Sequence, residues 1–421
     1  MKILIINTSE RVGGAAIAAD RLMQAWKNTF SGDRGQTAGM LVRDRQSDRL
    51  SVSSIPSSWL LPFKFLWERL VVFLNNGWRR SSVFAVDIAN TGTDVTRMKE
   101  FQKADVVHLH WVNQAFLSLK DLERIFQSGK RIVITMHDQW YFTGICHYSA
   151  TCNKYESQCE HCPQLGRPIF GYDMARRVFN RKRSIYQKAH LTFVGCSQWI
   201  ADLAQRSVLT QGQRVISIPN TIDTERFAPQ DKIAARQTNH LPIDRKLLLF
   251  SCQRITNEIK GFRYMSEACR ILHEQHPDIA AHLGLVVVGG DSDKVREQVA
   301  IEVFNVDYVN GEDQMATLYN AVDIFVTPSL QDNLPNTIME ALACGVPCVG
   351  FNIGGIPEMI DDRQNGYVAH YRDAEDFANG ILWTLDPERY AELAKAARQK
   401  VLDCYSEERV AKLYMEIYAK A

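Results

Sequence analysis

The chain has 421 residues, enough for about two to three domains. Its composition is that of an ordinary globular protein, with 46% hydrophobic and 23% charged residues, and its formal net charge of +1 argues against a nucleic-acid-binding protein that relies on a strong basic field. No apolar run reaches the roughly 18 uncharged residues of a membrane-spanning helix, so we expect none.

The chain opens on a short apolar run, Met1 to Asn7, that is typical of a strand. This run lacks the longer apolar region and the cleavage site of a signal peptide, so we expect a cytoplasmic protein. In that compartment the ten cysteines indicate reduced thiols or metal ligands rather than a disulfide framework.

A pair of glycines, Gly13 and Gly14, follows this strand and opens a predicted helix that runs to about Trp26. Small residues at a helix start let the backbone approach a ligand closely. The alternative is that the glycines serve only the turn, and the pattern is not the G-x-G-x-x-G of dinucleotide-binding proteins. A second strand is predicted from Thr37 to Val42.

The stretch from Trp59 to Trp78 is apolar and aromatic, but Pro62 and several charged residues interrupt it. Apolar side chains at helical spacing, followed by Arg79 and Arg80, are typical of an amphipathic helix that lies on an anionic membrane face. The other interpretation is a helix packed on the protein core.

Two more strands, residues 104–111 and 131–138, enclose a predicted helix from Leu119 to Gln127. This βαβ unit predicts a parallel sheet, and the ligands of open α/β sheets collect beyond the carboxyl ends of the strands. Four polar side chains occur at those ends: His108, His110, His137 and Asp138. Any single histidine could be a satisfied structural residue. Two strand ends that bring histidine to one edge favour a ligand site, above all at His137.

Four of the ten cysteines have the spacing C-x5-C-x6-C-x2-C: Cys146, Cys152, Cys159 and Cys162. Four thiolates can hold zinc tetrahedrally and staple a loop that has little core of its own. His147 or His161 could replace one thiolate, and disulfides or unligated thiols are the other two interpretations. A catalytic zinc is not expected, because a four-cysteine site leaves no open coordination position.

A basic stretch at 176–188, usually a solvated helix face, precedes a polar linker at 223–244, and a second α/β series follows. The strands of this series are predicted at 247–251, 285–288, 307–309, 323–327 and 347–351, with helices at 262–275 and 313–320. Two cations, Arg254 and Lys260, flank the loop after its first strand. They could clamp a diphosphate, although two surface cations can also lack any such role.

The segment from Asp332 to Glu340 leads from a strand into a helix whose first turn suits Pro335. Free N–H groups and the positive dipole end make a helix start an anion site. The carboxylates of Asp332 and Glu340 could accept hydrogen bonds from hydroxyl groups. Sites for phosphate and for a polyol together predict a sugar nucleotide.

The same segment resembles a known family. Asp332-x7-Glu340, followed by Ala-Leu-Ala-Cys-Gly-Val-Pro, is similar to the E-x7-E element of retaining glycosyltransferase family 4. Further matching motifs occur in the family's order over nearly the whole chain: Gly13-Gly14, His137, residues 218–223, Arg254 with Lys260-Gly261, Pro328-Ser329 and residues 354–358. The cysteine-rich insert at 144–165 resembles the exopolysaccharide and colanic-acid branch of the bacterial enzymes.

The resemblance implies an α/β protein of the GT-B fold, in which two Rossmann-like domains with parallel sheets face across a cleft. The expected bounds are 1–222 for the acceptor-side domain, 223–400 for the nucleotide-sugar-binding domain, and 401–421 for a helix that packs back on the first. The resemblance also implies transfer, with retention and without a catalytic metal, from a nucleoside diphosphate sugar to a saccharide or polyprenyl-diphosphate-linked acceptor. Such an enzyme of exopolysaccharide or O-antigen synthesis is expected in the cytoplasm or on the inner face of the cytoplasmic membrane, with no nucleic-acid partner.

Carried over residue by residue, the resemblance implies three candidate catalytic residues. Glu340 would bind the ribose hydroxyls, Asp332 would stand by the hydroxyls of the donor sugar, and His137 would contact that sugar near the reacting centre. Arg254 and Lys260 would neutralise the leaving diphosphate in place of a metal ion.

The remaining carried-over positions contribute mainly backbone groups. They would hold phosphate or sugar at Gly13, Gly14, Asn333 and Leu334. Residues around Tyr308 and Val309 would line the pocket for the base.

Two positions depart from the family pattern. Asp332 stands where the family usually has glutamate, and Pro335, which supplies no N–H, stands where glycine is common. The alternative functions are a nucleotide-sugar epimerase of the same fold and a non-catalytic nucleotide-sugar-binding protein. Intact Arg254, Lys260 and Glu340 argue against the second of these.

Overall fold

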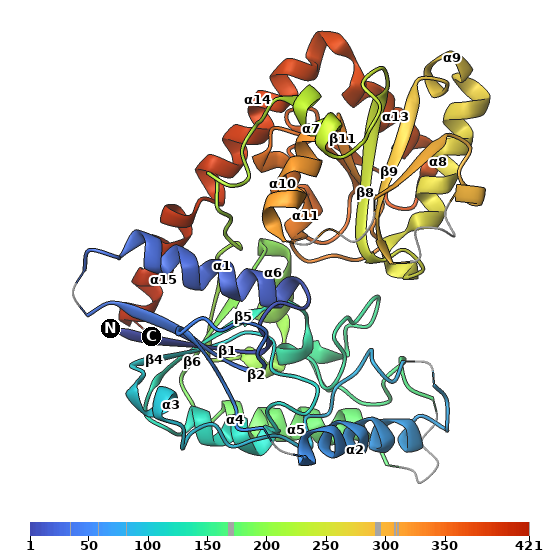
Figure 1. Cartoon of the computed structure of the whole chain (residues 1–421). Helices are drawn as coiled ribbons and strands as arrows, with labels where there is room; N and C mark the ends of the chain where they lie inside the picture. The colour runs from blue at the N-terminus through green and yellow to red at the C-terminus, as the bar shows by residue number, and fades with distance from the viewer. Residues whose placement is uncertain are drawn as a thin grey trace. The chain divides into compact units, whose positions relative to one another are not determined.

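The computed structural model describes residues 1–33, 35–57, 59–80, 82–166, 172–290, 296–306, 309 and 311–420. The chain forms two compact units, of which the first combines Met1–Asn220 with Val410–Ala421 and the second spans Thr221–Arg409 (Figure 1). Each unit is built around its own parallel sheet.

The first unit contains a seven-stranded sheet in the order β3-β2-β1-β4-β5-β6-β7. Its strands are β1 (Lys2–Ser9), β2 (Thr37–Asp44), β3 (Val52–Ser54), β4 (Val106–Leu109), β5 (Arg131–Met136), β6 (Leu191–Gly195) and β7 (Arg214–Ser217). Side chains alternate between the two faces, so Ile3 and Ile5 enter one core while Leu4 and Ile6 enter the other. Apolar residues occupy both positions because helices cover both faces.

The helices of the first unit divide between those two faces. They are α1 (Gly14–Thr29), α2 (Leu60–Asn75), α3 (Lys99–Lys103), α4 (Leu119–Phe126), α5 (Met174–Tyr186), α6 (Gln198–Arg206) and α15 (Glu407–Lys420). Helices α1 and α15 lie side by side on one face, where the rings of Trp26 and Tyr418 approach to 5.3 Å (Figure 1). Helices α4 and α5 help to close the core on the other face.

The second unit contains a six-stranded sheet in the order β10-β9-β8-β11-β12-β13. Its strands are β8 (Lys246–Arg254), β9 (Leu283–Gly290), β10 (Glu302–Val306), β11 (Ile324–Thr327), β12 (Cys348–Phe351) and β13 (Gly366–Ala369). Its helices are α7 (Lys232–Thr238), α8 (Phe262–Gln275), α9 (Pro277–Ala280), α10 (Glu312–Ala321), α11 (Asn336–Ala343), α12 (Ile356–Met359), α13 (Ala374–Leu385) and α14 (Pro387–Cys404).

Both sheets place a switch point next to their first strand. In the first sheet β1 lies between β2 and β4, and in the second β8 lies between β9 and β11, so the chain reverses its direction of progress across the sheet at these strands. Ligands of open α/β sheets bind beyond the carboxyl ends of the strands at such points. The topology therefore directs attention to the loops after β1 and β4 and to those after β8 and β11.

Several expected bounds differ from the structure. The strand predicted at 307–309 lies at Glu302–Val306, and Asp307 and Tyr308 are outside the described residues. The predicted linker at 223–244 contains helix α7. The units divide after Asn220 rather than after residue 222, and the boundary expected at 400/401 falls inside α14, since the return to the first unit begins at Val410.

Helices α14 and α15 explain why the boundary expected at 400/401 lies further along the chain. Helix α14 continues through residue 401 because its apolar face, with Leu393, Ala397 and Val401 buried, stays on the second unit. In α15, Val410 and Ile417 are buried in the first unit's core. Among the described helices, none combines the length and apolar composition needed to cross a membrane.

Candidate functional site

In the second unit, loops after β8, β11 and β12 meet at the carboxyl edge of the sheet. The backbone N–H of Leu330 donates to the Ile259 carbonyl oxygen at 2.7 Å, and the Gly355 N–H donates to the Asp332 carbonyl oxygen at 3.3 Å. Gly261 has φ 69°, and a Cβ there would lie 1.8 Å from the carbonyl oxygen of Pro328. Both the backbone conformation and the close approach therefore require glycine at this position.

An ion pair lies where these loops meet. Lys260 Nζ lies 2.8 Å from Asp332 Oδ2, and the two side chains are 33% and 15% exposed. The negative charge of Asp332 is the main reason that the pKa of Lys260 rises above its usual value. The structure thus joins two residues with separately predicted roles, Lys260 at the diphosphate and Asp332 at the sugar hydroxyls.

Glu340 lies on the buried side of helix α11, where it is 7% exposed. The hydroxyl of Tyr319, from α10, donates to Glu340 Oε2 at 2.8 Å. This contact fixes the carboxylate, and no sequence pattern pointed to Tyr319 as a functional residue. Helix α11 begins after Pro335, which has φ −65° and supplies no side-chain cap, and the preceding Asn333 and Leu334 are buried.

The second predicted cation, Arg254, is the last residue of β8 and is exposed. Among the described residues, no ion pair of its guanidinium occurs. Of the two residues predicted to line a base pocket, Tyr308 lies outside the described residues and Val309 is half-buried.

In the first unit, Gly13 and Gly14 occupy the turn between β1 and α1. Gly13 has φ 91°, and no atom would lie within 4 Å of a Cβ placed there. The left-handed backbone, rather than crowding, therefore calls for glycine at this helix start. This leaves open space beside the turn and is compatible with both interpretations of the glycine pair.

The predicted histidines form a hydrogen-bonded chain at the ends of β4 and β5. His110 Nδ1 lies 2.8 Å from His137 Nε2, and His137 Nδ1 lies 3.4 Å from Cys196 Sγ. Burial lowers the pKa of His137 to about 4 and the pKa of His110 well below its usual value. Both imidazoles are therefore neutral near pH 7, and His137 can act as a hydrogen-bonding group rather than as a cation.

His108 and Asp138 have structural roles. His108 bonds Thr135 Oγ1 and Tyr418 Oη, both at 2.7 Å, and burial lowers its pKa to about 3. Asp138 Oδ2 lies 2.7 Å from His147 Nδ1 and accepts a hydrogen bond from Trp111 Nε1 at 2.9 Å. Their hydrogen bonds within the unit explain both residues, His108 inside β4 and Asp138 after β5. His137 remains the candidate for the predicted ligand site.

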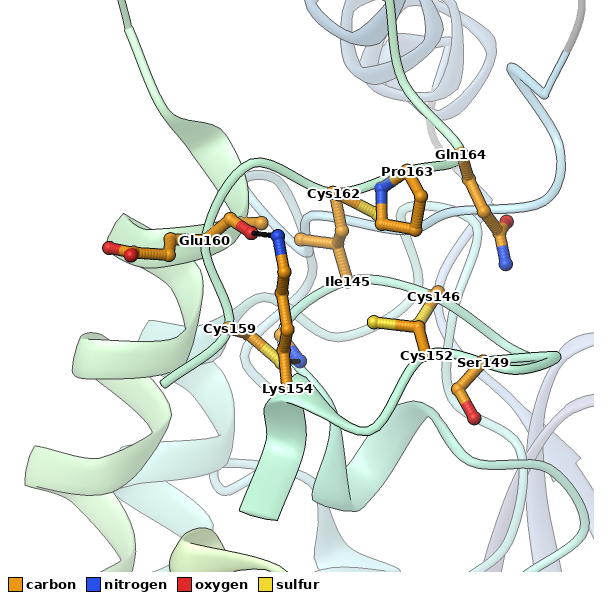
Figure 2. A pocket seen from close by; sticks show the side chains of 12 residues that line it. Ile145, Cys146, Ser149, Cys152, Lys154, Cys159, Glu160, Cys162, Pro163 and Gln164 are labelled. Carbon is orange, nitrogen blue, oxygen red and sulfur yellow. Dashed lines mark hydrogen bonds between the residues drawn. The ribbon is translucent and has the colours of Figure 1, made fainter. Parts of the chain in front are cut away.

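The four clustered cysteines line one small cavity of about 20 Å³ (Figure 2). The Gly144 N–H donates to Cys159 Sγ at 3.3 Å. The thiol of Cys146, with help from two backbone N–H groups, lowers the pKa of Cys162 to about 7. Within the described part of the chain, however, no three of these sulfurs lie within 4.8 Å of one another, and all ten cysteines are free.

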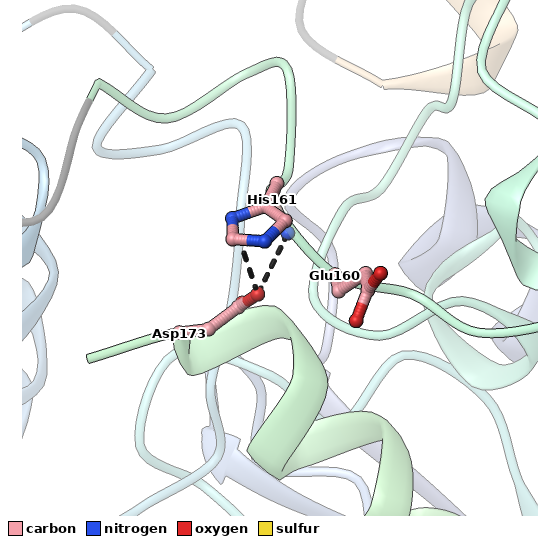
Figure 3. A group of neighbouring side chains, drawn as sticks. All are labelled: Glu160, His161 and Asp173. Carbon is pink, nitrogen blue, oxygen red and sulfur yellow. Dashed lines mark hydrogen bonds and ion pairs between the residues drawn. The ribbon is translucent and has the colours of Figure 1, made fainter. Parts of the chain in front are cut away.

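The two histidines named as possible zinc ligands point elsewhere. His147 binds Asp138. His161 lies beside Glu160 and Asp173, and these three are the described side chains whose potential ligand atoms all fall within 4.8 Å of one another (Figure 3). Asp173 already accepts backbone hydrogen bonds from His161 at 2.8 Å and Arg176 at 3.1 Å, the second as the cap of α5. Capping explains this cluster without a metal.

Two family models match this chain, one mainly within each unit. Residues 245–386 match the model described as glycosyl transferases group 1, and residues 68–226 match the model for glycosyltransferase family 4. D-inositol 3-phosphate glycosyltransferase of Saccharomonospora viridis is 29% identical over 213 residues, 48% of each chain. An uncharacterized glycosyltransferase of Methanocaldococcus jannaschii is 24% identical over 356 residues, 79% of this chain and 89% of that one. The chain spans about half the length of the first three curated relatives it matches.

Solved structures of similar fold cover the whole chain. Sucrose-phosphate synthase from Thermosynechococcus elongatus has a TM-score of 0.68 at 19% identity, and Anabaena Alr3699/HepE in complex with UDP-glucose has 0.64 at 16% identity. Each likeness covers 100% of both chains. At these identities the likeness shows the fold alone, and it confirms the predicted GT-B class with its two parallel-sheet Rossmann-like domains.

Proposed function

We propose that this chain, which belongs to the group 1 glycosyltransferases of family 4, transfers a sugar from a nucleoside diphosphate sugar to a saccharide acceptor. The observation that carries the proposal is the Lys260–Asp332 pair at the switch point of the second sheet, in the unit that matches the group 1 model. The UDP-glucose bound by the similarly folded HepE and the inositol-phosphate glycosyltransferase among the relatives support a nucleotide-sugar donor.

The positive charges of Lys260 and Arg254 would stabilise a diphosphate leaving group. When the bond between the anomeric carbon and the phosphate oxygen breaks, negative charge develops on the diphosphate and positive charge on the sugar. Lys260 and Arg254 are the cations that would stabilise the first without a metal ion. The acceptor hydroxyl attacks the anomeric carbon from the same face that the diphosphate leaves, so the configuration at that carbon is retained. The proton of the hydroxyl passes to the leaving phosphate oxygen.

Donor binding would rearrange the ion pair. A phosphate group competes for Lys260 Nζ, and the carboxylate of Asp332 then becomes available to hydroxyl groups of the donor sugar. Glu340, oriented by Tyr319, would accept hydrogen bonds from the ribose. The neutral imidazole of His137 would hydrogen-bond the sugar near the reacting carbon, and the turn at Gly13-Gly14 and the backbone at Asn333 and Leu334 would hold phosphate or sugar.

The test is release of nucleoside diphosphate in the presence of EDTA. Thermal stabilisation by a panel of nucleotide sugars first identifies the donor. We expect turnover with acceptor, and strong losses for Lys260→Ala and Glu340→Ala but not for Lys395→Ala, an exposed lysine on α14. Full activity of both site variants would refute the site. Donor consumed without acceptor would indicate an epimerase, and binding without turnover would indicate a binding protein.

We also propose a lipid-linked acceptor, namely a growing saccharide on polyprenyl diphosphate in exopolysaccharide or O-antigen synthesis at the inner face of the cytoplasmic membrane. One similarly folded structure, WaaG, is a glycosyltransferase involved in lipopolysaccharide biosynthesis, with a TM-score of 0.62. The test compares a polyprenyl-diphosphate-linked saccharide with the same free saccharide. Equal use of both would remove the lipid from the proposal.

A structural zinc at the cysteine cavity is a separate proposal. It is supported by the N–H groups directed at Cys159 and Cys162. Lys182, whose pKa burial lowers to about 7, lies close to Cys146 and Cys159 and would favour their thiolates in its protonated form. Coordination needs Zn–S distances of about 2.3 Å, so the sulfurs must draw closer than in the metal-free arrangement. Metal analysis of protein purified without added zinc should find about one zinc per chain. A metal-free, fully folded protein would reject the site.

A further inference from the structure

Helix α2 exposes its apolar side chains to the outside of the first unit. The exposed set recurs at the three- to four-residue spacing of a single helix face. It comprises Trp59 (76% exposed), Leu60 (43%), Phe63 (59%), Leu66 (63%), Trp67 (55%) and Leu70 (40%). The inner side of α2 is apolar as well, since Val72 is buried and Leu61 and Phe73 pack on the core. The helix therefore carries a second apolar face that the protein itself does not cover.

The charged residues of the same helix point inward. Glu68 is completely buried and Arg69 nearly so, and the Arg69 guanidinium lies 3.2 Å from Glu68 and 3.1 Å from the buried Asp87. Arg69 also donates to the carbonyl oxygens of Val83 and Val86 at 2.7 and 3.0 Å. These buried polar contacts fix which side of α2 faces the protein, so the outward direction of the apolar face is built into the fold.

The apolar face continues beyond the helix. Trp78 and Phe84 are 61% and 67% exposed, and the Phe84 ring stacks on Phe65 of α2 at 6.5 Å. Eight of the 17 large hydrophobic side chains that are exposed in the described residues therefore lie between positions 59 and 84. We call this region the α2 apolar surface. Such a concentration marks an interaction site rather than scattered surface hydrophobics.

The charges around the α2 apolar surface are positive. Arg79 and Arg80 are exposed, and Glu68 is the only acidic residue between positions 59 and 84. Because Glu68 is buried, the surface presents cations and tryptophans with no exposed carboxylate of its own stretch. This combination is typical of helices that lie in the interface of an anionic bilayer, where tryptophan sits at the level of the headgroups.

We propose that the α2 apolar surface docks on an anionic lipid bilayer. A second copy of the chain fits less well, because a two-fold contact would place Arg79 and Arg80 of both copies in one interface without an exposed carboxylate from this stretch to balance them. The inference deepens the proposed use of a lipid-linked acceptor by naming the surface that meets the membrane. It uses none of the residues assigned to the donor.

The test is co-sedimentation of the full chain with large unilamellar vesicles of phosphatidylcholine alone or with 40% phosphatidylglycerol, a composition of roughly the charge of an anionic leaflet. We expect binding to the anionic vesicles that weakens with salt. Phe63→Glu/Trp67→Glu should reduce the partition coefficient on the order of tenfold or more. Arg79→Ala/Arg80→Ala should reduce it by roughly fivefold for each charge removed.

Matched controls are Ile243→Glu and Ile279→Glu, which change exposed isoleucines of the second unit, 64% and 45% exposed, and should bind like the parent. Failure of the parent chain to bind anionic vesicles, or equal loss in the controls, would overturn the proposal. A dimer in solution that Phe63→Glu/Trp67→Glu dissociates would overturn it in favour of a second copy. Donor-site variants such as Lys260→Ala should still bind vesicles, and the docking variants should still transfer sugar to a detergent-dissolved acceptor, which separates failure of docking from failure of catalysis.

Discussion

The two sheet edges of this protein share a topology but differ in their electrostatics. At the β8/β11 edge, Lys260 and Asp332 are charged, paired and partly exposed. At the β4/β5 edge, His110 and His137 are uncharged because burial lowers their pKa values, and they are hydrogen-bonded to each other. The carboxyl edges of two similar sheets thus carry polar groups in different charge states.

This difference suits the two tasks of the proposed reaction. A leaving diphosphate gains charge as the bond breaks, so fixed cations contribute most at the edge that holds it. The hydroxyl groups of a sugar stay neutral, and a neutral imidazole binds them without the cost of keeping a charge buried. The histidine edge accordingly depends on burial for its protonation state, while the lysine edge depends on a partner.

Low pH should destabilise the histidine edge of the first unit more than the lysine edge of the second. His108, His110 and His137 have folded pKa values below the 6.5 of an unfolded histidine, so below about pH 6.5 the unfolded chain binds more protons and stability falls. For His108 and His137, with pKa values of about 3 and about 4, the change from pH 6.5 to pH 5 should cost roughly 2 kcal/mol of unfolding free energy each, and His110 acts in the same direction. His147 acts the other way, because Asp138 raises its pKa despite burial.

Hydrogen exchange at pH 7 and pH 5 checks this prediction. Backbone amides of β4 and β5 should lose protection at pH 5 before those of β8 and β11. The reverse order would mean that the buried histidines do not control the acid stability of the first unit.

Removal of the cation should have the largest effect on turnover. We expect Lys260→Ala to lower kcat about 10²–10³-fold, the usual cost of losing a group that stabilises developing charge. His137→Ala, at the neutral edge, should cost less. Lys395→Ala serves as the control for loss of a lysine from the second unit. Steady-state kinetics with saturating donor decides the order, and an equal or greater loss at His137 would break the proposed division between the edges.

Replacing Asp332, the partner of Lys260, should change the pH dependence of turnover. Asp332 raises the pKa of Lys260 in the donor-free protein, so Asp332→Asn should return that pKa toward the ordinary lysine value and move the alkaline limb of the kcat/KM profile to lower pH. The direction follows because the lysine then loses its proton earlier as pH rises. Asp332→Glu, which keeps the charge, should leave the limb near its original position. An unmoved limb in Asp332→Asn would show that Lys260 does not set it.

The sequence predicted much of this fold because the strands of both sheets are apolar runs separated by helical patterns. It also offered His137, Lys260, Asp332 and Glu340 as candidate site residues, and their role in binding stays a prediction. It could not predict that Lys260 pairs with Asp332, because 72 positions separate them and only the packed loops bring them together. Nor does the sequence mark Tyr319, because a single tyrosine in a helix has the pattern of a core residue, and only the fold shows its hydrogen bond to Glu340.

The α2 apolar surface and the histidines show a second limit of prediction from sequence. For residues 59–78 the pattern indicated an amphipathic helix, but periodicity cannot tell which face points outward. The answer depends on Asp87, outside the helix, which binds Arg69. Likewise the sequence pattern treated His108 and Asp138 as it treated His137. The structure places His108 inside β4, bonded to Tyr418, and bonds Asp138 to His147, so both serve the core.

The smallest expected effect concerns the partner of Glu340. Tyr319→Phe removes a buried hydrogen bond to Glu340 Oε2 while keeping the ring, so it should cost about 1 kcal/mol, or roughly fivefold, in donor affinity. Titration calorimetry with the donor measures this, and Tyr390→Phe, which removes a hydroxyl bonded to the Asp323 carbonyl on the same unit, is the matched control. If donor affinity falls in the first variant alone, Glu340 is a ligand that needs orienting, as Lys260 needs Asp332. If both variants only lower thermal stability, the carboxylate belongs to the core, and the charged edge of the second unit holds the donor through Lys260 and Arg254.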